Sequence, residues 1–231
     1  QLIEDNRIPM IWHELKRSAE LEKRRGEIAE WNSKNPHRKR GLAMTPVKFG
    51  ISFTVTHLNQ AGALVLIYQD GTVQLNHGGT EMGHGLHTNV AMIAAQTLGV
   101  KLADIRVMPT STDKVPNTSA TAASAGTDLN GAAAKNACEI LRGRLLPIAQ
   151  VLLKEKLGSA PKLESISSVN GEIFDSTAPQ TKLTFAQVAQ KAYFSRVSLS
   201  ATGYYATPGI HWDRMAGRGK PFHYFAYGAA V

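Results

Sequence analysis

The amino-acid sequence predicts an α+β fold of small mixed sheets with packed helices. Strand-like and helix-like segments follow one another without the strict alternation of a parallel α/β sheet. Asp70-Gly71 lies between two strand-like runs, and Asn170-Gly171 lies in another, which is a strong signal for antiparallel hairpins. Thr184 and Gln187 have the spacing of a helix capping box. Together these patterns favour small antiparallel sheets combined with separate helices.

The N-terminal part of the chain is predicted to be helical and basic, over residues 1–40. The helical pattern covers residues 8–33, where Pro9 suits a first helical position and Ser18 is a candidate cap for a second helix. A polar linker follows. Strand candidates then occur at residues 42–46, 51–55, 63–68 and 72–76.

The middle of the chain alternates helix and loop. An apolar stripe with helical period predicts a helix over residues 86–99, with Gly99 as its C-terminal residue. A strand is predicted at 105–108. A long helix follows from about residue 129 to 153, and Pro147 is expected to kink or interrupt it.

The last third contains a hairpin at 169–173, a helix that begins at the capping box, and a strand at 199–206. A loop at 211–220 leads to an apolar run, residues 222–231, that reads as a buried strand. Because the chain stops inside this run, we expect a piece of a longer polypeptide. Residues 41–231 are accordingly predicted to form one α+β domain that is cut short at its C-terminal end.

The net charge of +8 comes largely from two basic clusters, residues 23–25 and 37–40. Such clusters occur in nucleic-acid-binding proteins, but no aromatic side chains are interleaved with them to stack on bases. We therefore interpret them as a solvated face or one that meets an acidic partner. No nucleic acid is predicted to bind.

Cysteine usage and hydropathy limit the class of protein. The single cysteine, Cys138, excludes a disulfide framework or a cysteine-ligated iron–sulfur cluster in this chain. It reads as a buried small residue rather than a reactive thiol. The sequence contains no apolar run of eighteen residues, and its first residues lack the pattern of a signal peptide. We expect a cytoplasmic protein without membrane contact.

Two loops of small residues organise the chain: the first loop, residues 77–85, and the second loop, residues 115–128. The first has four glycines within the eight residues 78–85, and the second is rich in Ala, Ser and Thr. Glycine lets backbone N–H groups approach a ligand closely, and the N-terminus of the following helix adds free donors. The loops are predicted to form two walls of a pocket for a large polar ligand, one that carries phosphate.

Polar side chains in the first loop leave alternatives open. His77, His84 and His87 resemble metal ligands in type, but no carboxylate or cysteine completes a familiar set, which favours structural or ligand-contacting roles. Glu81 is either a general base or a cap for the backbone amides of its own loop, and the cap is preferred. The loop matches neither a Walker A motif nor a dinucleotide fingerprint, and the chain has no Gly-x-Ser-x-Gly motif.

Several motifs resemble the molybdenum-binding part of the xanthine dehydrogenase and aldehyde oxidase family. They are Phe49-Gly50-Ile51-Ser52-Phe53-Thr54, residues 60–64, His77-Gly78-Gly79-Thr80-Glu81-Met82-Gly83-His84-Gly85-Leu86-His87, residues 115–124 and residues 224–228. The resemblance extends over nearly the whole chain and is strongest to members that act on xanthine. It identifies the chain as a central segment of a molybdopterin-binding domain.

The resemblance implies a function for the complete protein. It would be an oxidoreductase that hydroxylates hypoxanthine and xanthine to urate with a molybdopterin cofactor. Iron–sulfur clusters and FAD on other domains or subunits would carry electrons to NAD, within a hetero-oligomer. The family's catalytic glutamate lies in a motif that this chain does not contain. We therefore assign no catalytic residue, and expect the chain alone to be inactive.

The resemblance also assigns residues. Phe53, Thr54 and Ala122 match positions at the substrate, where the ring of Phe53 would contact a flat purine. Gly83, His84, Gly85 and Ala123 match positions at the cofactor. His84 departs from the family, which usually has Gln there. Two alternatives stay open: a non-catalytic cofactor-binding module, and a related hydroxylase of aldehydes or N-heterocycles.

Overall fold

The computed structural model describes residues 5–231, and its contacts divide the chain into two compact units. One unit contains the described residues up to Ser52 together with Phe222–Val231, and the other is Phe53–Pro221. Both combine helices with small sheets, so the predicted α+β class is confirmed. A functional division at residue 41 stays a prediction, and residues 1–4 of the predicted N-terminal segment lie outside the described residues.

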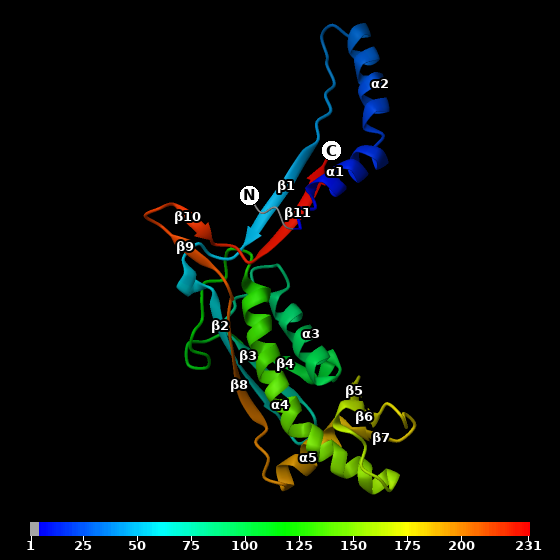
Figure 1. The fold of residues 1–231 in the computed structure, drawn as a ribbon, viewed down its shortest axis with the longest axis vertical. Helices are drawn as coiled ribbons and strands as arrows, with labels where there is room; N and C mark the ends of the chain where they lie inside the picture. The colour runs from blue at the N-terminus through cyan, green and yellow to red at the C-terminus, as the bar shows by residue number, and fades with distance from the viewer. Residues whose placement is uncertain (1–4) are drawn as a thin grey trace. The chain divides into compact units, whose positions relative to one another are not determined.

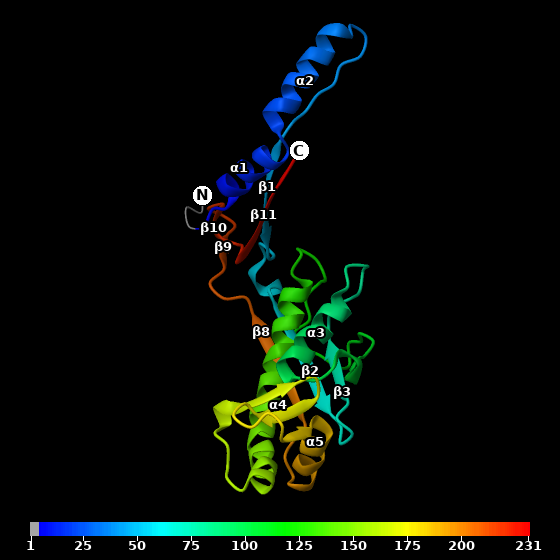
Figure 2. The same ribbon diagram turned by 90° about the vertical axis from the view of Figure 1, so that its right-hand side faces the viewer.

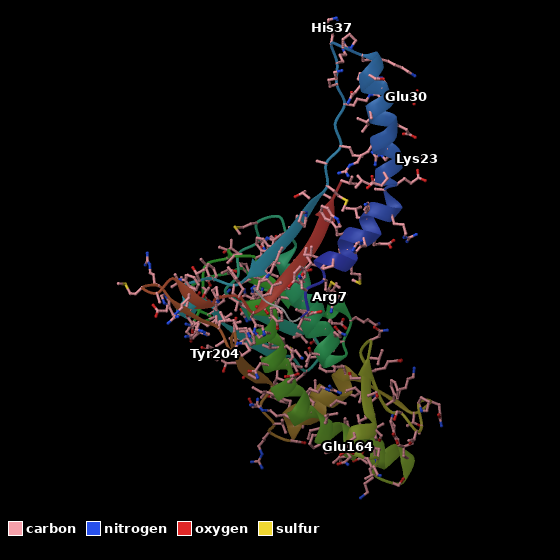
Figure 3. The ribbon with its side chains drawn as sticks, turned by 45° about the horizontal axis from the view of Figure 1, so that its top comes forward. Arg7, Lys23, Glu30, His37, Glu164 and Tyr204 are labelled. Atoms are coloured by element: carbon pink, nitrogen blue, oxygen red, sulfur yellow. The ribbon has the colours of Figure 1, made fainter. Side chains whose placement is uncertain are left out.

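The first unit joins two helices to a two-stranded sheet. Helices α1 (Ile8–Ser18) and α2 (Leu21–Lys34) confirm the predicted helical pair. Figure 3 shows Lys23 and Glu30 on α2, the charged helix of the pair. Strand β1 (Thr45–Ile51) pairs antiparallel with β11 (Tyr224–Ala230). The predicted cap was wrong, because α2 follows Glu20, and the Ser18 hydroxyl bonds the carbonyl of Leu15 instead.

The second unit is built on a four-stranded sheet in the order β4-β3-β2-β8. The central hairpin consists of β2 (Gln60–Ile67) and β3 (Val73–His77), and confirms the prediction from Asp70-Gly71. Strand β8 (Ser200–Ala206) pairs antiparallel with β2, and β4 (Ile105–Val107) pairs parallel with β3. This arrangement carries the end of β3 directly into the first loop.

Two helices pack side by side against this sheet, as Figure 1 shows. They are α3 (Leu86–Leu98), which ends at the predicted Gly99, and α4 (Gly126–Leu157). Cys138 lies on the buried side of α4, and burial raises the pKa of its thiol to about 12, so it is an inert core residue. Helix α4 continues through Pro147, so the helix is not interrupted there, and the alternative, a kink at Pro147, stays a prediction.

A three-stranded sheet and α5 lie against the C-terminal half of α4 (Figure 2). The sheet contains β5 (Ile166–Val169), β6 (Glu172–Asp175) and β7 (Lys182–Thr184). Thr184 and Gln187 form both hydrogen bonds of the predicted capping box at the start of α5 (Phe185–Phe194). Three 3₁₀ turns complete the unit: η1 (Thr56–Leu58), η2 (Leu102–Asp104) and η3 (Leu163–Ser165).

Four segments differ from the sequence prediction. The strand predicted at 42–46 lies at 45–51, and the strand predicted to be buried at 222–231 has only exposed and half-buried residues. Residues 53–55 are not a strand, because the side chain of Asn59 takes the backbone N–H and C=O of Phe53 that a strand would use. The predicted loop at 211–220 contains a short hairpin of β9 (His211–Asp213) and β10 (Arg218–Lys220). Within residues 5–231, no helix is long and apolar enough to cross a membrane.

Candidate functional site

The first loop is folded around the carboxylate of Glu81. Its Oε1 accepts hydrogen bonds from the N–H groups of Gly83 (2.9 Å) and Gly85 (3.0 Å), and its Oε2 accepts one from His87 (3.2 Å). Gly83 and Gly85 have φ angles of 90° and 75°, which a residue with a Cβ adopts only with strain. Glu81 thus caps its own loop, as the preferred sequence interpretation predicts.

This arrangement corrects the predicted role of the α3 N-terminus. We expected free N–H groups there for a ligand phosphate, but the Glu81 carboxylate occupies the N-terminus through the N–H of His87. Desolvation opposes the charged form of Glu81, yet the hydrogen bonds from His87, Gly85 and Gly83, with the charge of His84, lower its pKa to about 2. Glu81 therefore stays ionised and engaged, unsuited to act as a general base near neutral pH.

The second loop contacts the first and leads into α4. The Thr121 hydroxyl accepts a hydrogen bond from the N–H of Thr80 at 2.9 Å, which joins the two loops. Ala123 and Ser124 both have φ angles of 53°, an uncommon conformation for residues with a Cβ. This bend brings the loop into α4 at Gly126. The two loops thus form neighbouring walls, as predicted.

Between these walls lies a hollow of about 400 Å³. His84 and Ala122, two of the predicted site residues, line it. The imidazole of His84 is 42% exposed, and its Nδ1 lies 3.7 Å from Glu81 Oε1. The remaining lining residues come from both loops and the start of α4: Met82, Thr121, Ser124, Gly126 and Thr127. Gly83, Gly85 and Ala123 are adjacent in sequence to lining residues.

Phe53 and Thr54 are not among the described residues that line this hollow. Phe53 is half-buried and Thr54 is exposed, in the segment that precedes η1. Asn59 holds Phe53 in place: its Oδ1 accepts the Phe53 N–H at 2.7 Å, and its Nδ2 donates to the Phe53 carbonyl at 2.9 Å. Sequence reasoning missed Asn59. Its only available signal was an Asn six residues after Phe53, a spacing without a familiar motif.

His77 and His87 contact each other and do not form a group with His84. His77 Nε2 lies 3.1 Å from His87 Nδ1, and His77 Nδ1 accepts the N–H of Gly79 at 3.1 Å. Within residues 5–231, no group of three or more His, Cys, Asp or Glu side chains is arranged to hold a metal ion. These contacts give His77 a structural role in the first loop.

Because His77 is buried, we expect the folded chain to lose stability in acid. Burial, and then the charge of His87, lower the pKa of His77 from 6.5 to about 4. Between these values the unfolded chain binds the proton and the folded chain does not, so this contribution is complete above pH 6.5 and is lost as pH falls toward 4. Replacing His77 by Gln should remove a pH dependence of about 1 kcal/mol per pH unit.

Urea unfolding of the wild type and the His77→Gln variant between pH 7 and pH 4.5 measures this difference. His57→Gln is the control, because His57 is exposed. Parallel curves for the wild type and the His77→Gln variant would contradict the assignment of a buried neutral imidazole.

The chemistry of the hollow fits an anionic, heavily oxygenated ligand such as molybdopterin. Among the described residues that line it there is no carboxylate, and the hydroxyls of Thr121, Ser124 and Thr127 offer donors. The first N–H groups of α4 have no acceptor within the helix and carry its positive dipole end. A phosphate oxygen at Gly126 and Thr127 would face these groups. Gly83 and Gly85 add no side chain to the first wall, where Met82 and His84 line the hollow.

Comparisons with known proteins agree with this fit. The model of the molybdopterin cofactor-binding domain family matches residues 14–231. The chain is 44% identical over 230 residues to xanthine dehydrogenase of Oryza sativa subsp. japonica, an alignment that covers 100% of this chain and 15% of that protein. It is 45% identical over 231 residues to xanthine dehydrogenase of Blastobotrys adeninivorans, covering 100% and 14%. The chain thus spans about 15% of the length of these relatives.

Solved structures share the fold at low identity. Quinoline 2-oxidoreductase from Pseudomonas putida 86 superposes with a TM-score of 0.73 and 22% identity, over 95% of this chain and 30% of that one. A Cu,Mo-CO dehydrogenase superposes with a TM-score of 0.74 and 18% identity, over 96% and 27%. The family model covers most of the sequence, and the fold of its solved neighbours is the same. The chain belongs to the molybdopterin cofactor-binding domain family.

Proposed function

We propose that this chain supplies part of the molybdopterin and purine pocket of a xanthine dehydrogenase-like hydroxylase. The hollow between the two loops carries the proposal, because it combines low bulk, hydroxyl donors and a helix N-terminus. Identities of 42–45% to proteins named xanthine dehydrogenase or xanthine dehydrogenase/oxidase favour hypoxanthine and xanthine as substrates and urate as the product. Bound molybdopterin would supply the redox chemistry of the hydroxylation.

The residues of the first loop would bind the cofactor. Gly83 and Gly85 keep their positive φ angles through the Glu81 carboxylate, and this conformation presents His84 at the hollow. A neutral imidazole offers one donor and one acceptor, as a glutamine amide does in another geometry. Ala123, in its bend, would leave space for the cofactor on the other side. His84 is thus proposed to fill the role that Gln has in most of the family.

The substrate side is proposed to include Phe53, Thr54 and Ala122. The two hydrogen bonds from the side chain of Asn59 fix the backbone of Phe53. Less conformational entropy is then lost when the ring of Phe53 stacks on a purine. Ala122 is exposed at the hollow and would set the space available next to the cofactor. These residues would bind and orient the substrate; the general base would come from another part of the enzyme.

The complete enzyme is proposed to work with further domains or subunits. Iron–sulfur clusters and FAD would accept the electrons and pass them to NAD, in a hetero-oligomer. This chain covers only about 15% of the length of its relatives, which supports the proposal that other domains or subunits hold these cofactors. Hypoxanthine oxidation by the 231-residue polypeptide alone would contradict it.

An Ala122→Leu substitution tests the proposed pocket. The larger side chain would extend into the hollow, while the exposed position leaves the fold unchanged. Misplacing a bound substrate by about 1 Å can cost about 100-fold in rate, so we expect kcat/KM for hypoxanthine to fall by about this factor in the full-length enzyme. Ala120→Leu is the control, since Ala120 is exposed in the same loop and outside the described lining. Equal activities of the two variants would refute the pocket.

Substitutions of His84 test the cofactor contact. The His84→Gln variant should retain its molybdenum content, because an amide replaces both hydrogen-bonding functions of the imidazole. The His84→Ala variant should lose about tenfold in cofactor affinity, the factor for one hydrogen bond to a charged ligand. Molybdenum per protein, measured by mass spectrometry after dilution and dialysis, reports the difference. A His84→Ala variant that keeps its molybdenum as well as an exposed-site variant, His57→Ala, would disprove the contact.

A further inference from the structure

His77 connects the sheet to the first loop. It is the last residue of β3 and is 2% exposed. One ring nitrogen, Nδ1, accepts the N–H of Gly79, and the other, Nε2, lies 3.1 Å from His87 Nδ1. The rings of His77 and His87 are 5.0 Å apart and tilted by 54°. Both nitrogens of the buried ring are thus engaged with groups of the first loop and of α3.

The contacts define where the protons lie. Because Gly79 donates to Nδ1 of His77, that nitrogen carries no proton. The neutral ring then carries its proton on Nε2 and donates it to His87 Nδ1. His87 must accept at Nδ1, so its own proton is on Nε2. A proton on Nδ1 of either ring would place two donors against each other.

The same hydrogen-bond chain continues to the loop that bears His84. The backbone N–H of His87 donates to Glu81 Oε2, and Glu81 Oε1 accepts the N–H groups of Gly83 and Gly85. The hydroxyl of Thr110 also donates to the carbonyl of Gly79 at 2.8 Å. The ring of His77 therefore contacts the first loop at Gly79 and α3 at His87. Thr110 and Thr121 add hydrogen bonds at Gly79 and Thr80 that do not involve this ring.

We propose that His77 is a positioning residue of the cofactor pocket, which sets the tautomer of His87 and holds the first loop in the conformation that presents His84. This inference rests on the proposed function for its link to molybdopterin. The tautomers and the loop order depend on the chain alone. A disordered loop would lose the fixed position of His84, which lies between the two contacts of the His77 ring.

Two substitutions separate the two contacts of the His77 ring. In His77→Asn the side-chain oxygen replaces Nδ1, so the Gly79 contact is kept and the reach to His87 is lost. In His77→Gln the longer amide replaces Nε2, so the His87 contact is kept and the Gly79 contact is lost. Each variant replaces a hydrogen-bonding side chain with another, and His57→Gln serves as the exposed control.

Two-dimensional NMR of the uniformly ¹⁵N-labelled full chain measures both the histidine tautomers and the exchange of backbone amides at neutral pH. The wild type should show His77 and His87 with the proton on Nε2. The His77→Asn variant should leave His87 as a mixture of tautomers. The His77→Gln variant should keep His87 unchanged and make the Gly79 amide exchange with solvent about tenfold faster, the factor for one lost hydrogen bond.

Two results would overturn the proposal: a wild-type His77 that carries its proton on Nδ1, or a His87 tautomer that does not change in the His77→Asn variant. The first result is measured on the wild type, so it does not depend on the folding of a variant. Molybdenum content of the full-length protein is the second measurement. We expect the molybdenum content to fall about tenfold in both His77 variants, as for other groups that orient ligand-binding residues through hydrogen bonds. Normal tautomer changes with unaltered molybdenum would refute the positioning role. A wild type with the expected tautomers but no molybdopterin would refute only the proposed function.

Discussion

A Glu81→Gln substitution should remove most of the molybdenum from the protein. The carboxylate accepts three backbone N–H groups with its two oxygens. A glutamine has one oxygen, and its NH₂ group would face one of these donors. The first loop would then open and α3 would lose its cap. Replacing a group that orients ligand-binding residues through hydrogen bonds typically lowers the affinity for the ligand by about 10- to 100-fold. We expect the affinity for the cofactor to fall within this range.

The pH dependence gives an independent measure of the same contact. The pKa of Glu81 is lowered from 4.5 to about 2 in the folded chain. Its contribution to stability is therefore complete above pH 4.5, and is lost as pH falls toward 2. The Glu81→Gln variant should lack this dependence and melt at a lower temperature at neutral pH.

A matched control is available in Glu164, an exposed residue of η3 that is labelled in Figure 3. In the sequence η3 follows the C-terminal end of α4, whereas the hollow lies at the N-terminal end of this helix. The Glu164→Gln variant removes the same charge without an effect on the first loop. Molybdenum content and melting temperature should equal those of the wild type. An equal loss of molybdenum in both variants would mean that net charge, rather than the loop, is responsible.

Local patterns account for the elements that sequence reasoning placed correctly. The hairpin at Asp70-Gly71 and the capping box at Thr184 depend on residues a few positions apart, so their chemistry is visible in a short window. The walls of the hollow were also predictable, since small residues beside a helix N-terminus leave room for a ligand near backbone N–H groups. The prediction of Glu81 as a cap followed from its position as the only carboxylate inside a glycine-rich loop, whose amides need an acceptor.

Errors arose where a distant or side-chain partner decides the structure. Strand β1 pairs with β11, about 180 residues away in sequence, and no local signal specifies that register. The expected strand at 51–55 fails because Asn59 satisfies the backbone of Phe53. The pairing of His77 with His87 depends on the turn of the first loop, which the spacing of the histidines does not reveal.

The contact between β8 and α4 depends on a glycine that carries no functional group. A Cβ at position 203 would overlap the carbonyl oxygen of Ala133 and lie 2.6 Å from the backbone nitrogen of Ala137. Backbone atoms of a packed helix cannot move aside as a flexible side chain can. The Gly203→Ala variant should therefore be destabilised by about 3 kcal/mol, the upper part of the usual range for overpacked cores.

Gly143 provides a control for which we expect the opposite effect on stability. It lies within α4, and a Cβ there would meet no atom within 4 Å. Alanine has the higher helix propensity, so Gly143→Ala should stabilise the chain by about 0.5 to 1 kcal/mol. Denaturant unfolding of the two variants measures the difference, and equal midpoints would show that β8 and α4 do not pack this closely.

The Gly203 contact also bears on the cofactor pocket. Helix α4 begins at the hollow with Gly126 and Thr127, and it packs on β8 about two to three turns later, around Ala133 and Ala137. A rigid helix that is pushed away from the sheet carries its N-terminus with it. The Gly203→Ala variant should therefore lose molybdenum even under conditions in which it remains folded, whereas Gly143→Ala should not. If the folded Gly203→Ala variant retains its molybdenum, the N-terminus of α4 is not a wall of the cofactor pocket.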